Sequence, residues 1–296
     1  MLRRLILFFL FLFPAALFGK SRIECSALKS TVLNRAVRYC VVLPDNFQAA
    51  NRQPSTQRYP VLYFLHGLGN DEQTLFSSSG WNVIEDLREQ RRIGDFFVVA
   101  PEGGRSFFIN SADGKTRYSD FFLKEFIPYV ERKYPIRAER RARAISGVSM
   151  GGYGALRHAF AHPELFGSVS AESPALIPAS PSELNAAIQS GTPLGNLLGQ
   201  AFGTPINGAH WQANDPMALA RRNAARLRRL AIYFNCGQSD NLGFDKGARA
   251  LHRELQSLKI AHEYHLYPGD HSLEYFLTHL GEAMEFHWKA FGQTKR

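Results

Sequence analysis

The stretch RAISGVSMGGYGAL, residues 143–156, decides how this chain folds. Its first four residues are typical of a short buried strand, and the residues from Gly152 onward favour a helix. Between them lies a Gly-x-Ser-x-Gly pattern centred on Ser149. On a sharp strand-to-helix turn a serine hydroxyl projects clear of the backbone above a helix N-terminus, and Gly147 and Gly151 let strand and helix nearly touch. A chance match in a glycine-rich chain is the alternative, but the flanking strand and helix favour a nucleophilic serine.

Apolar runs and amphipathic segments alternate along the rest of the chain. The expected strands lie at about 22–29, 36–43, 61–65, 96–100, 143–146, 168–171, 230–234 and 262–266. The expected helices lie at about 80–92, 118–133, 152–160, 244–258 and 271–290. The first two strands read as an antiparallel pair, and the others alternate with helices. The pattern predicts an α/β fold, with a mostly parallel central sheet flanked by helices on both faces.

The segment 173–228 interrupts this alternation with many prolines and glycines. It is too long for a plain connection between two elements. We expect it to be a partly helical insertion over the active-site end of the sheet, inside a single domain that spans 21–296.

A serine hydrolase also needs a base and an acid that orients the base. Asp240 follows the expected strand at 230–234, and His271 follows the last expected strand. Both lie at carboxyl ends of strands, where open α/β sheets place their sites. The chain order Ser, Asp, His is that of α/β-hydrolases. The sequence therefore assigns Ser149 as nucleophile, His271 as base and Asp240 as orienting acid.

Other residues compete for these roles. Asp240 taken alone would suit an ordinary turn. Asp245 is the competing acid but is expected in the following helix, and Asp270 adjoins the base too closely to reach its ring. His262 and His265 are expected inside the last strand, as sheet residues.

An oxyanion hole requires two backbone N–H groups aimed at one point. Met150, the residue after the nucleophile, would supply one of them. The loop 66–70 after the third expected strand would supply the other, since its glycines let the backbone approach a substrate closely. An ordinary strand-ending turn is the alternative interpretation of this loop.

Four motifs in order give the chain a resemblance to the esterase D family of α/β-hydrolases. The motifs are HGLGN at 66–70, PEGG at 101–104, GVSMGG at 147–152 and GDHSLEY at 269–275. The resemblance runs from about residue 30 to 290. That family includes S-formylglutathione hydrolases, tributyrin-type acetyl esterases, feruloyl esterases and mycolyltransferases. Family members differ in the region that corresponds to the insertion, so substrate specificity does not carry over.

The resemblance implies a role for five residues of this chain. Ser149, Asp240 and His271 would form the catalytic triad. Leu68 and Met150 would supply the oxyanion N–H groups. An apparent signal peptide fits poorly with a cytosolic S-formylglutathione hydrolase.

The first 20 residues read as a secretory signal peptide. Arg3 and Arg4 precede an apolar run from Leu5 to Phe18, and small residues lie near a cleavage point. The run is short for a membrane span of about 20 residues, although an uncleaved anchor is the alternative. We expect an exported protein, periplasmic or secreted, whose contact with membrane is limited to this segment if it stays uncleaved.

The formal net charge is +9, with basic clusters at 137–143 and 221–229. Attraction to an anionic polymer is one interpretation of these clusters, and a solvated rim around the sheet is the favoured one. No nucleic-acid motif accompanies the charge, so we expect no nucleic-acid partner. No Cys/His spacing indicates a metal site, and we expect no cofactor.

The chain contains three cysteines, Cys25, Cys40 and Cys236. An exported protein could form one disulfide from them. If the first hairpin turned near Asn34 and Arg35, however, Cys40 would face residue 29 rather than Cys25. We therefore expect free, mostly buried thiols.

These observations predict an exported serine carboxylesterase that hydrolyses short-chain acyl or aryl esters of small molecules through an acyl-enzyme. Acyl transfer to an alcohol and thioester hydrolysis stay open as alternatives, because different acceptors and leaving groups use the same acyl-enzyme. A binding protein on a retired hydrolase scaffold is the non-enzymatic alternative, and the intact Ser/Asp/His order argues against it.

Overall fold

A computed structural model describes residues 22–44, 47, 57–191 and 193–292. Within them eight strands form one sheet in the order β1-β2-β4-β3-β5-β6-β7-β8. The strands are β1 (Ile23–Ser30), β2 (Arg35–Val42), β3 (Val61–Leu65), β4 (Phe97–Pro101), β5 (Arg143–Val148), β6 (Ser168–Glu172), β7 (Ala231–Gly237) and β8 (Glu263–Tyr267). β2 runs antiparallel to both of its neighbours, and every other pair is parallel. This is the α/β-hydrolase fold that the sequence predicts.

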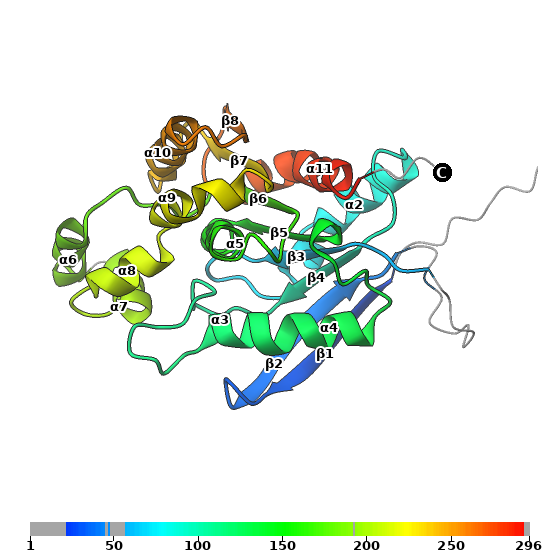
Figure 1. Ribbon diagram of the computed structural model, residues 1–296, viewed down its shortest axis with the longest axis horizontal. Coiled ribbons are helices and arrows are strands. Elements are labelled where there is room, and N and C mark those ends of the chain that lie inside the picture. The colour runs from blue at the N-terminus through cyan, green and yellow to red at the C-terminus, as the bar shows by residue number, and fades with distance from the viewer. Residues whose placement is uncertain (1–21, 45–46, 48–56, 192, 293–296) are drawn as a thin grey trace, which may run out of the picture.

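Helices cover both faces of the sheet (Figure 1). The helices are α1 (Thr74–Ser77), α2 (Gly80–Glu89), α3 (Tyr118–Phe121), α4 (Ile127–Lys133), α5 (Met150–Ala161), α6 (Pro181–Gln189), α7 (Pro193–Phe202), α8 (Gly208–Asn214), α9 (Pro216–Leu227), α10 (Phe244–Ser257) and α11 (Leu273–Ala290). α2 and α11 pack on one face, over a core that includes Leu62, Val98 and Ala144. The alternate residues of the same strands, among them Tyr63 and Ile145, enter the larger core on the other face. Strands buried on both sides explain the continuous apolar runs in the sequence.

The expected helix at 118–133 forms, but with a change of pitch in its middle. α3 and α4 are joined without a break by the π-helical turn Phe122–Phe126. Pro128 lies in the first turn of α4 and cannot donate a backbone hydrogen bond to the preceding turn. The wider π-helical turn before Pro128 accommodates the absence of this backbone N–H donor.

The expected insertion at 173–228 contains four helices, α6 to α9. In Figure 1, α6, α7 and α8 group together at one end of the molecule, while α9 lies against α5. Phe202 of α7 packs on Trp211 of α8 at 4.7 Å between ring centroids and on Tyr153 of α5 at 6.2 Å. The Tyr153 hydroxyl donates to the Asn214 carbonyl at 2.8 Å. The insertion is thus attached to the helix that follows Ser149.

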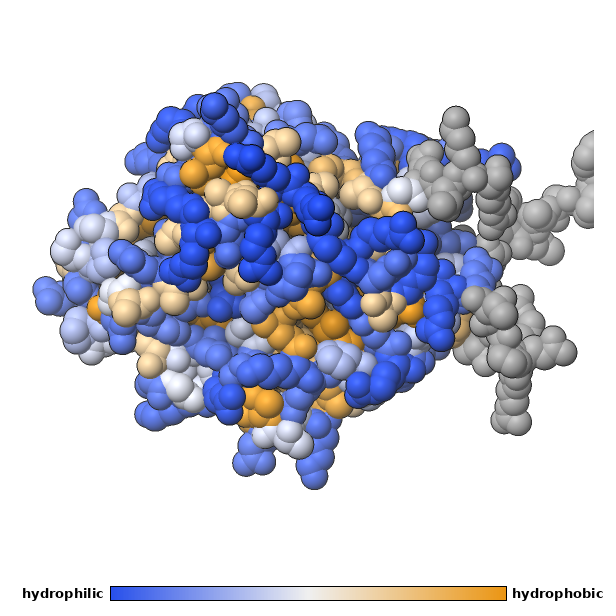
Figure 2. Space-filling model, viewed as in Figure 1, coloured by the Kyte–Doolittle hydropathy of each residue, from blue (hydrophilic) through white to orange (hydrophobic). Residues whose placement is uncertain are grey.

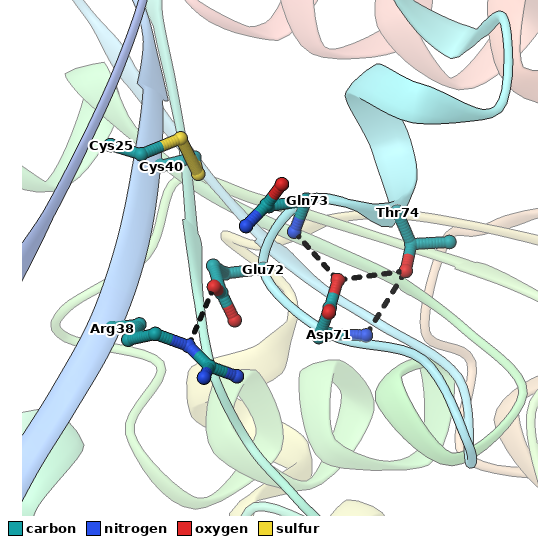
Figure 3. The surroundings of a disulfide bond; sticks show 7 residues. All are labelled: Cys25, Arg38, Cys40, Asp71, Glu72, Gln73 and Thr74. Atoms are coloured by element: carbon teal, nitrogen blue, oxygen red, sulfur yellow. Dashed lines mark hydrogen bonds and ion pairs between the residues drawn. A yellow bond between two sulfur atoms is a disulfide. The ribbon is translucent and has the colours of Figure 1, made fainter.

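The expectation of free thiols at Cys25 and Cys40 is wrong. The two residues form a disulfide and are register partners across β1 and β2 (Figure 3). The turn covers residues 31–34, earlier in the chain than a turn near Asn34 and Arg35. Cys40 therefore faces Cys25 rather than residue 29. Cys236 is free and buried, as expected.

An ion pair connects the disulfide hairpin to the loop after β3 (Figure 3). Arg38 Nε donates to the buried Glu72 at 2.8 Å. Asp71 accepts from the Gln73 N–H at 2.9 Å, and its own N–H donates to Thr74 Oγ1 at 3.0 Å. These contacts fix the segment that leads from the candidate oxyanion loop into α1.

Most residues on the face shown in Figure 2 are hydrophilic, and apolar residues appear between them in patches. In the part of the chain that the structure describes, no helix is both long and apolar enough to cross a membrane. The expected signal peptide lies outside the described residues.

Candidate active site

Ser149 lies on the turn between β5 and α5, in a backbone conformation that L-residues rarely adopt. Its φ is 54° and its ψ is −116°. A Cβ at Gly147 would lie 2.3 Å from the backbone of Gly151, and a Cβ at Gly151 would lie 2.0 Å from the Leu65 carbonyl oxygen. Only glycine fits at both positions, because β5, α5 and β3 approach one another so closely there. This close packing forces the sharp turn at Ser149. The Ser149 N–H donates to the Glu172 carbonyl at 2.9 Å, which holds the strained residue in place.

The structure brings the three residues that the sequence assigns to the triad into one hydrogen-bonded chain. His271 Nε2 lies 2.9 Å from Ser149 Oγ. His271 Nδ1 lies 2.8 Å from Asp240 Oδ2. With a proton on Nδ1, the ring donates to the carboxylate and Nε2 accepts from the serine hydroxyl. This is the tautomer that a general base requires.

Asp240 is held as a carboxylate by its surroundings. Burial alone would raise the pKa of Asp240, but hydrogen bonds from His271 and from the Leu242 and Phe244 backbone outweigh burial and lower it. The Leu242 N–H donates to Asp240 Oδ1 at 2.9 Å. The competing acid Asp245 lies in the first turn of α10 and faces Arg249 at 3.7 Å. The geometry therefore connects His271 to Asp240.

Backbone contacts join the loops that carry the acid and the base. The Ser239 N–H donates to the Gly269 carbonyl at 2.9 Å, and the Gln238 N–H donates to the Tyr267 carbonyl at 2.7 Å. A Cβ at Gly237 would meet the Gly269 oxygen at 2.5 Å. The two loops thus pack too tightly to move independently. The remaining candidates lie elsewhere: His265 is in β8, and His262, just before that strand, pairs with His252 at 2.8 Å.

The loop 66–70 lies against the nucleophile. A Cβ at Gly67 would lie 3.7 Å from the Ser149 Cβ, so the backbone of this loop faces the serine. Leu68 follows in this loop, and Met150 is the first residue of α5, whose N–H has no acceptor within the helix. Both expected oxyanion donors therefore belong to backbone segments beside Ser149.

Two buried histidines have structural roles that the sequence did not indicate. His66 Nε2 accepts from the Gly103 N–H at 2.8 Å, and its Nδ1 lies 2.8 Å from the Gly67 carbonyl. His158 of α5 lies 2.8 Å from the Phe108 carbonyl through Nε2. Burial lowers the pKa of both rings, so both are neutral at pH 7 and can accept or donate as these contacts need. His66 holds the loop after β4 against the candidate oxyanion loop, and His158 holds the same loop against α5. His66 was visible as part of a motif, but nothing in the pattern gave its partner.

Glu172, at the end of β6, is a second buried carboxyl group close to the site. Its side chain is fully buried, and neither of its oxygens has a hydrogen-bond partner within the described structure. It lines a cavity of about 40 Å³ together with Val148 and Phe276. Phe276 packs edge-on against the His271 ring, with 5.2 Å between centroids. Burial, with a smaller contribution from the charge of Glu282, raises the pKa of Glu172 to about 8.

Exposed leucines surround the site. Leu68, Leu242 and Leu273 are 43%, 53% and 52% exposed. Leu68 and Leu242 lie in loops that carry candidate site residues, and Leu273 begins α11 just after His271. Among the described residues, Ile23 alone is a further exposed large apolar residue. Apolar surface of this kind at the mouth of a site favours contact with an apolar part of a ligand. Within the same residues, no cluster of three or more His, Cys, Asp or Glu side chains could hold a metal ion.

The fold and this arrangement define an α/β-hydrolase. The family described as "Putative esterase" matches residues 30–287, and the chain belongs to this esterase family. An esterase of Mycobacterium tuberculosis is 28% identical over 252 residues, which cover 78% of this chain and 51% of that protein. The chain thus spans about half the length of the first curated relatives it matches.

Two further proteins show the same likeness over most of their length. An acetyl esterase of Caldicellulosiruptor saccharolyticus is 24% identical over 78% of this chain and 84% of its own. The solved structure of a ferulic acid esterase superposes with a TM-score of 0.76 at 25% identity, covering 92% of this chain and 99% of the other. Both likenesses agree with membership of the esterase family.

Proposed function

We propose that this protein is an exported serine carboxylesterase that hydrolyses short-chain acyl or aryl esters. The observation that carries the proposal is the hydrogen-bonded chain from Ser149 through His271 to Asp240, with 2.9 Å and 2.8 Å between successive partners. A base within hydrogen-bond reach of a strained, projecting serine, itself oriented by a carboxylate, is the arrangement that acyl transfer needs.

The reaction follows from these contacts. Ser149 Oγ attacks the ester carbonyl carbon while its proton passes to His271 Nε2. The negative oxygen that forms accepts hydrogen bonds from the Leu68 and Met150 N–H groups. The carbon–oxygen bond to the alcohol then breaks, and His271 returns the proton to the departing alcohol oxygen. A water molecule repeats the sequence on the acyl-enzyme, giving a carboxylic acid and free serine.

Asp240 stays ionised throughout this cycle. Its lowered pKa keeps the charge that stabilises the imidazolium form of His271. The ring also contacts two phenyl rings edge-on, Phe244 at 5.3 Å and Phe276 at 5.2 Å between centroids, and these contacts restrict its rotation. The histidine is therefore held in its working orientation before substrate binds.

The orientation of the apolar side chains in the insertion favours short acyl groups. Leu184, Leu197, Leu198 and Phe202 are buried in the protein core rather than lining a channel. A long acyl chain gains binding energy only where apolar wall meets it, at roughly 0.8 kcal/mol for each buried methylene. The similarity to an acetyl esterase points the same way.

Export is supported by two features of the chain. The N-terminal residues have the composition of a signal peptide. The Cys25–Cys40 disulfide is of a kind that persists in oxidising compartments and is rare in the cytosol. Both agree with a periplasmic or secreted enzyme.

The proposal is tested with p-nitrophenyl acetate and a fluorophosphonate probe. We expect Ser149→Ala to lose at least about 10³-fold in kcat and to lose probe labelling, with an unchanged circular dichroism spectrum. We expect Asp240→Asn to lose far more activity than the matched Asp245→Asn variant, because only Asp240 contacts His271. A Ser149→Ala enzyme with wild-type turnover, or equal losses in the two aspartate variants, would refute the assignment.

A further inference from the structure

A polar pocket of about 360 Å³ takes no part in the chemistry described above. Its volume is in the range of small-molecule binding sites. It lies between the β1–β2 turn, the loop from β4 to α3, and the end of α7. The side chains that could bind a ligand there are Arg35, Arg105, Lys115, Ser106, Thr116 and Gln200.

The pocket opens at the same edge of the sheet as the candidate active site. β2 runs antiparallel to β4, and Tyr39 pairs with Pro101 at the end of β4. Arg35, at the start of β2, therefore lies beyond the carboxyl end of β4. Ser149, at the end of β5, occupies the same edge. The pocket wall also contacts the candidate oxyanion loop, because the Gly103 N–H donates to the His66 ring at 2.8 Å.

The charge of the pocket is positive. Three cationic side chains line it, and none of the lining residues is acidic. Glu102 pairs with Arg35 at 3.1 Å, and Asp113 faces Lys115 at 3.5 Å. Within the described chain Arg105 has no ion-pair partner, so its guanidinium is available to a ligand.

The pocket wall is held in one conformation. Phe107 and Phe108 both have positive φ, 52° and 58°, which their surroundings must maintain. The Phe108 N–H donates to Ser106 Oγ at 3.0 Å, and the Phe108 carbonyl is bound by His158. With Gly103 fixed by His66, the two ends of the wall are attached to two buried histidines, one in the loop after β3 and one in α5. A preformed pocket requires less ordering when a ligand binds.

We propose that this pocket binds an anionic sugar unit in the alcohol part of the ester substrate. The proposal rests on the esterase function proposed above. A guanidinium recognises a carboxylate or phosphate group through paired hydrogen bonds. The hydroxyls of Ser106 and Thr116 and the amide of Gln200 suit the hydroxyl groups of a sugar. Since the acyl side of the site is expected to hold only short groups, a substrate part that reaches this pocket belongs to the alcohol.

The proposal is tested by kcat/KM on three acetyl esters that differ in charge. They are monoacetylated methyl glucuronide, monoacetylated methyl glucoside and monoacetylated glucose 1-phosphate, measured by acetate release. The variants are Arg105→Glu and, as a matched control with the same charge change, Arg222→Glu on the exposed surface of α9. p-Nitrophenyl acetate carries no sugar, so its hydrolysis measures ester cleavage without any contribution from the pocket.

We expect the wild-type enzyme to prefer at least one acidic ester over the neutral one. Arg105→Glu should remove this preference, lowering kcat/KM for the acidic ester by about fivefold or more, mainly through KM. Hydrolysis of p-nitrophenyl acetate should not change, and Arg222→Glu should behave as wild type. The glucuronide and phosphate arms show which anion the pocket prefers.

Two outcomes would overturn the proposal while leaving the esterase function intact. One is a wild-type enzyme that hydrolyses p-nitrophenyl acetate but does not distinguish acidic from neutral sugar esters. The other is an equal loss in Arg105→Glu and Arg222→Glu, which would assign the preference to overall charge rather than to the pocket. Failure of the esterase function is recognised separately, by absence of p-nitrophenyl acetate hydrolysis.

Discussion

Glu172→Gln should make the protein more stable relative to wild type as the pH rises. The native carboxyl has a pKa of about 8, against an ordinary value of 4.5. Between these values the folded protein retains a proton that the unfolded chain releases. The wild-type protein therefore loses stability as the pH rises through this window, and the loss is complete above about pH 8. Glutamine has no such proton and resembles the neutral acid in shape.

The size of the effect follows from the two pKa values. Each pKa unit corresponds to about 1.4 kcal/mol, so the difference in unfolding free energy between variant and wild type should grow by about 4 kcal/mol from pH 5 to pH 8.5. The experiment measures how this free-energy difference changes with pH, because that change does not depend on how well the glutamine amide packs. A full effect is expected because the carboxyl is fully buried and both oxygens lack partners.

The assay is urea unfolding at pH 5, 6, 7 and 8.5, followed by circular dichroism with the disulfide intact. Glu274→Gln, an exposed acid in the first turn of α11, is the matched control and should show no such growth. A difference that stays constant from pH 5 to pH 8.5 would show that Glu172 ionises normally in the folded protein. The inference that it is an uncharged acid at neutral pH would then be wrong.

Two further predictions concern the hairpin and the substrate. Replacing both Cys25 and Cys40 by serine should lower the free energy of unfolding by about 3 kcal/mol, as expected for a loop closed over 15 residues. Reduction of the wild type should have the same effect. Identical urea midpoints for the oxidised and reduced protein would contradict this prediction. For p-nitrophenyl esters, kcat/KM should be highest for acetate or butyrate and fall for octanoate and palmitate, because the apolar residues of the insertion are buried in the core. A maximum at octanoate or longer would reveal an acyl tunnel that the arrangement of these residues does not provide.

The parts of the fold that could be predicted from the sequence depend on local chemistry. The elbow was predictable because its Gly-x-Ser-x-Gly pattern is local, although the contact that requires glycine at Gly151 is with the distant Leu65. The buried strands were predictable because parallel strands covered on both faces are continuously apolar. Asp240 and His271 were predictable from their place after strands in a fixed chain order. Each inference used a sequence pattern that can be recognised without knowing which distant residues come into contact.

The register of the first hairpin could not be predicted in this way. A change of register by an even number of residues leaves every side chain on the same face of the sheet, so the apolar pattern cannot distinguish the alternatives. The turn is fixed instead by a distant residue. Glu125, in the π-helical turn, accepts from the Thr31 and Val32 N–H groups at 3.1 Å and from Ser30 Oγ at 2.5 Å. This contact places the turn at 31–34 and so brings Cys25 opposite Cys40.

The same limit explains why Glu172 and the pocket beside Arg105 emerged only from the structure. A glutamate at the end of a strand reads as solvent-exposed, and its burial depends on α11, which follows 100 residues later in the chain. The pocket combines a hairpin turn, a loop and a helix end from three separate parts of the sequence. The missing hydrogen-bond partners of Glu172 and the positive charge of the pocket both depend on residues that the fold brings together. No single motif contains those residues. The sequence motifs therefore cannot report buried or enclosed polar groups that the proposed chemistry does not use. The substrate preference and pH response of this protein should be sought in such groups.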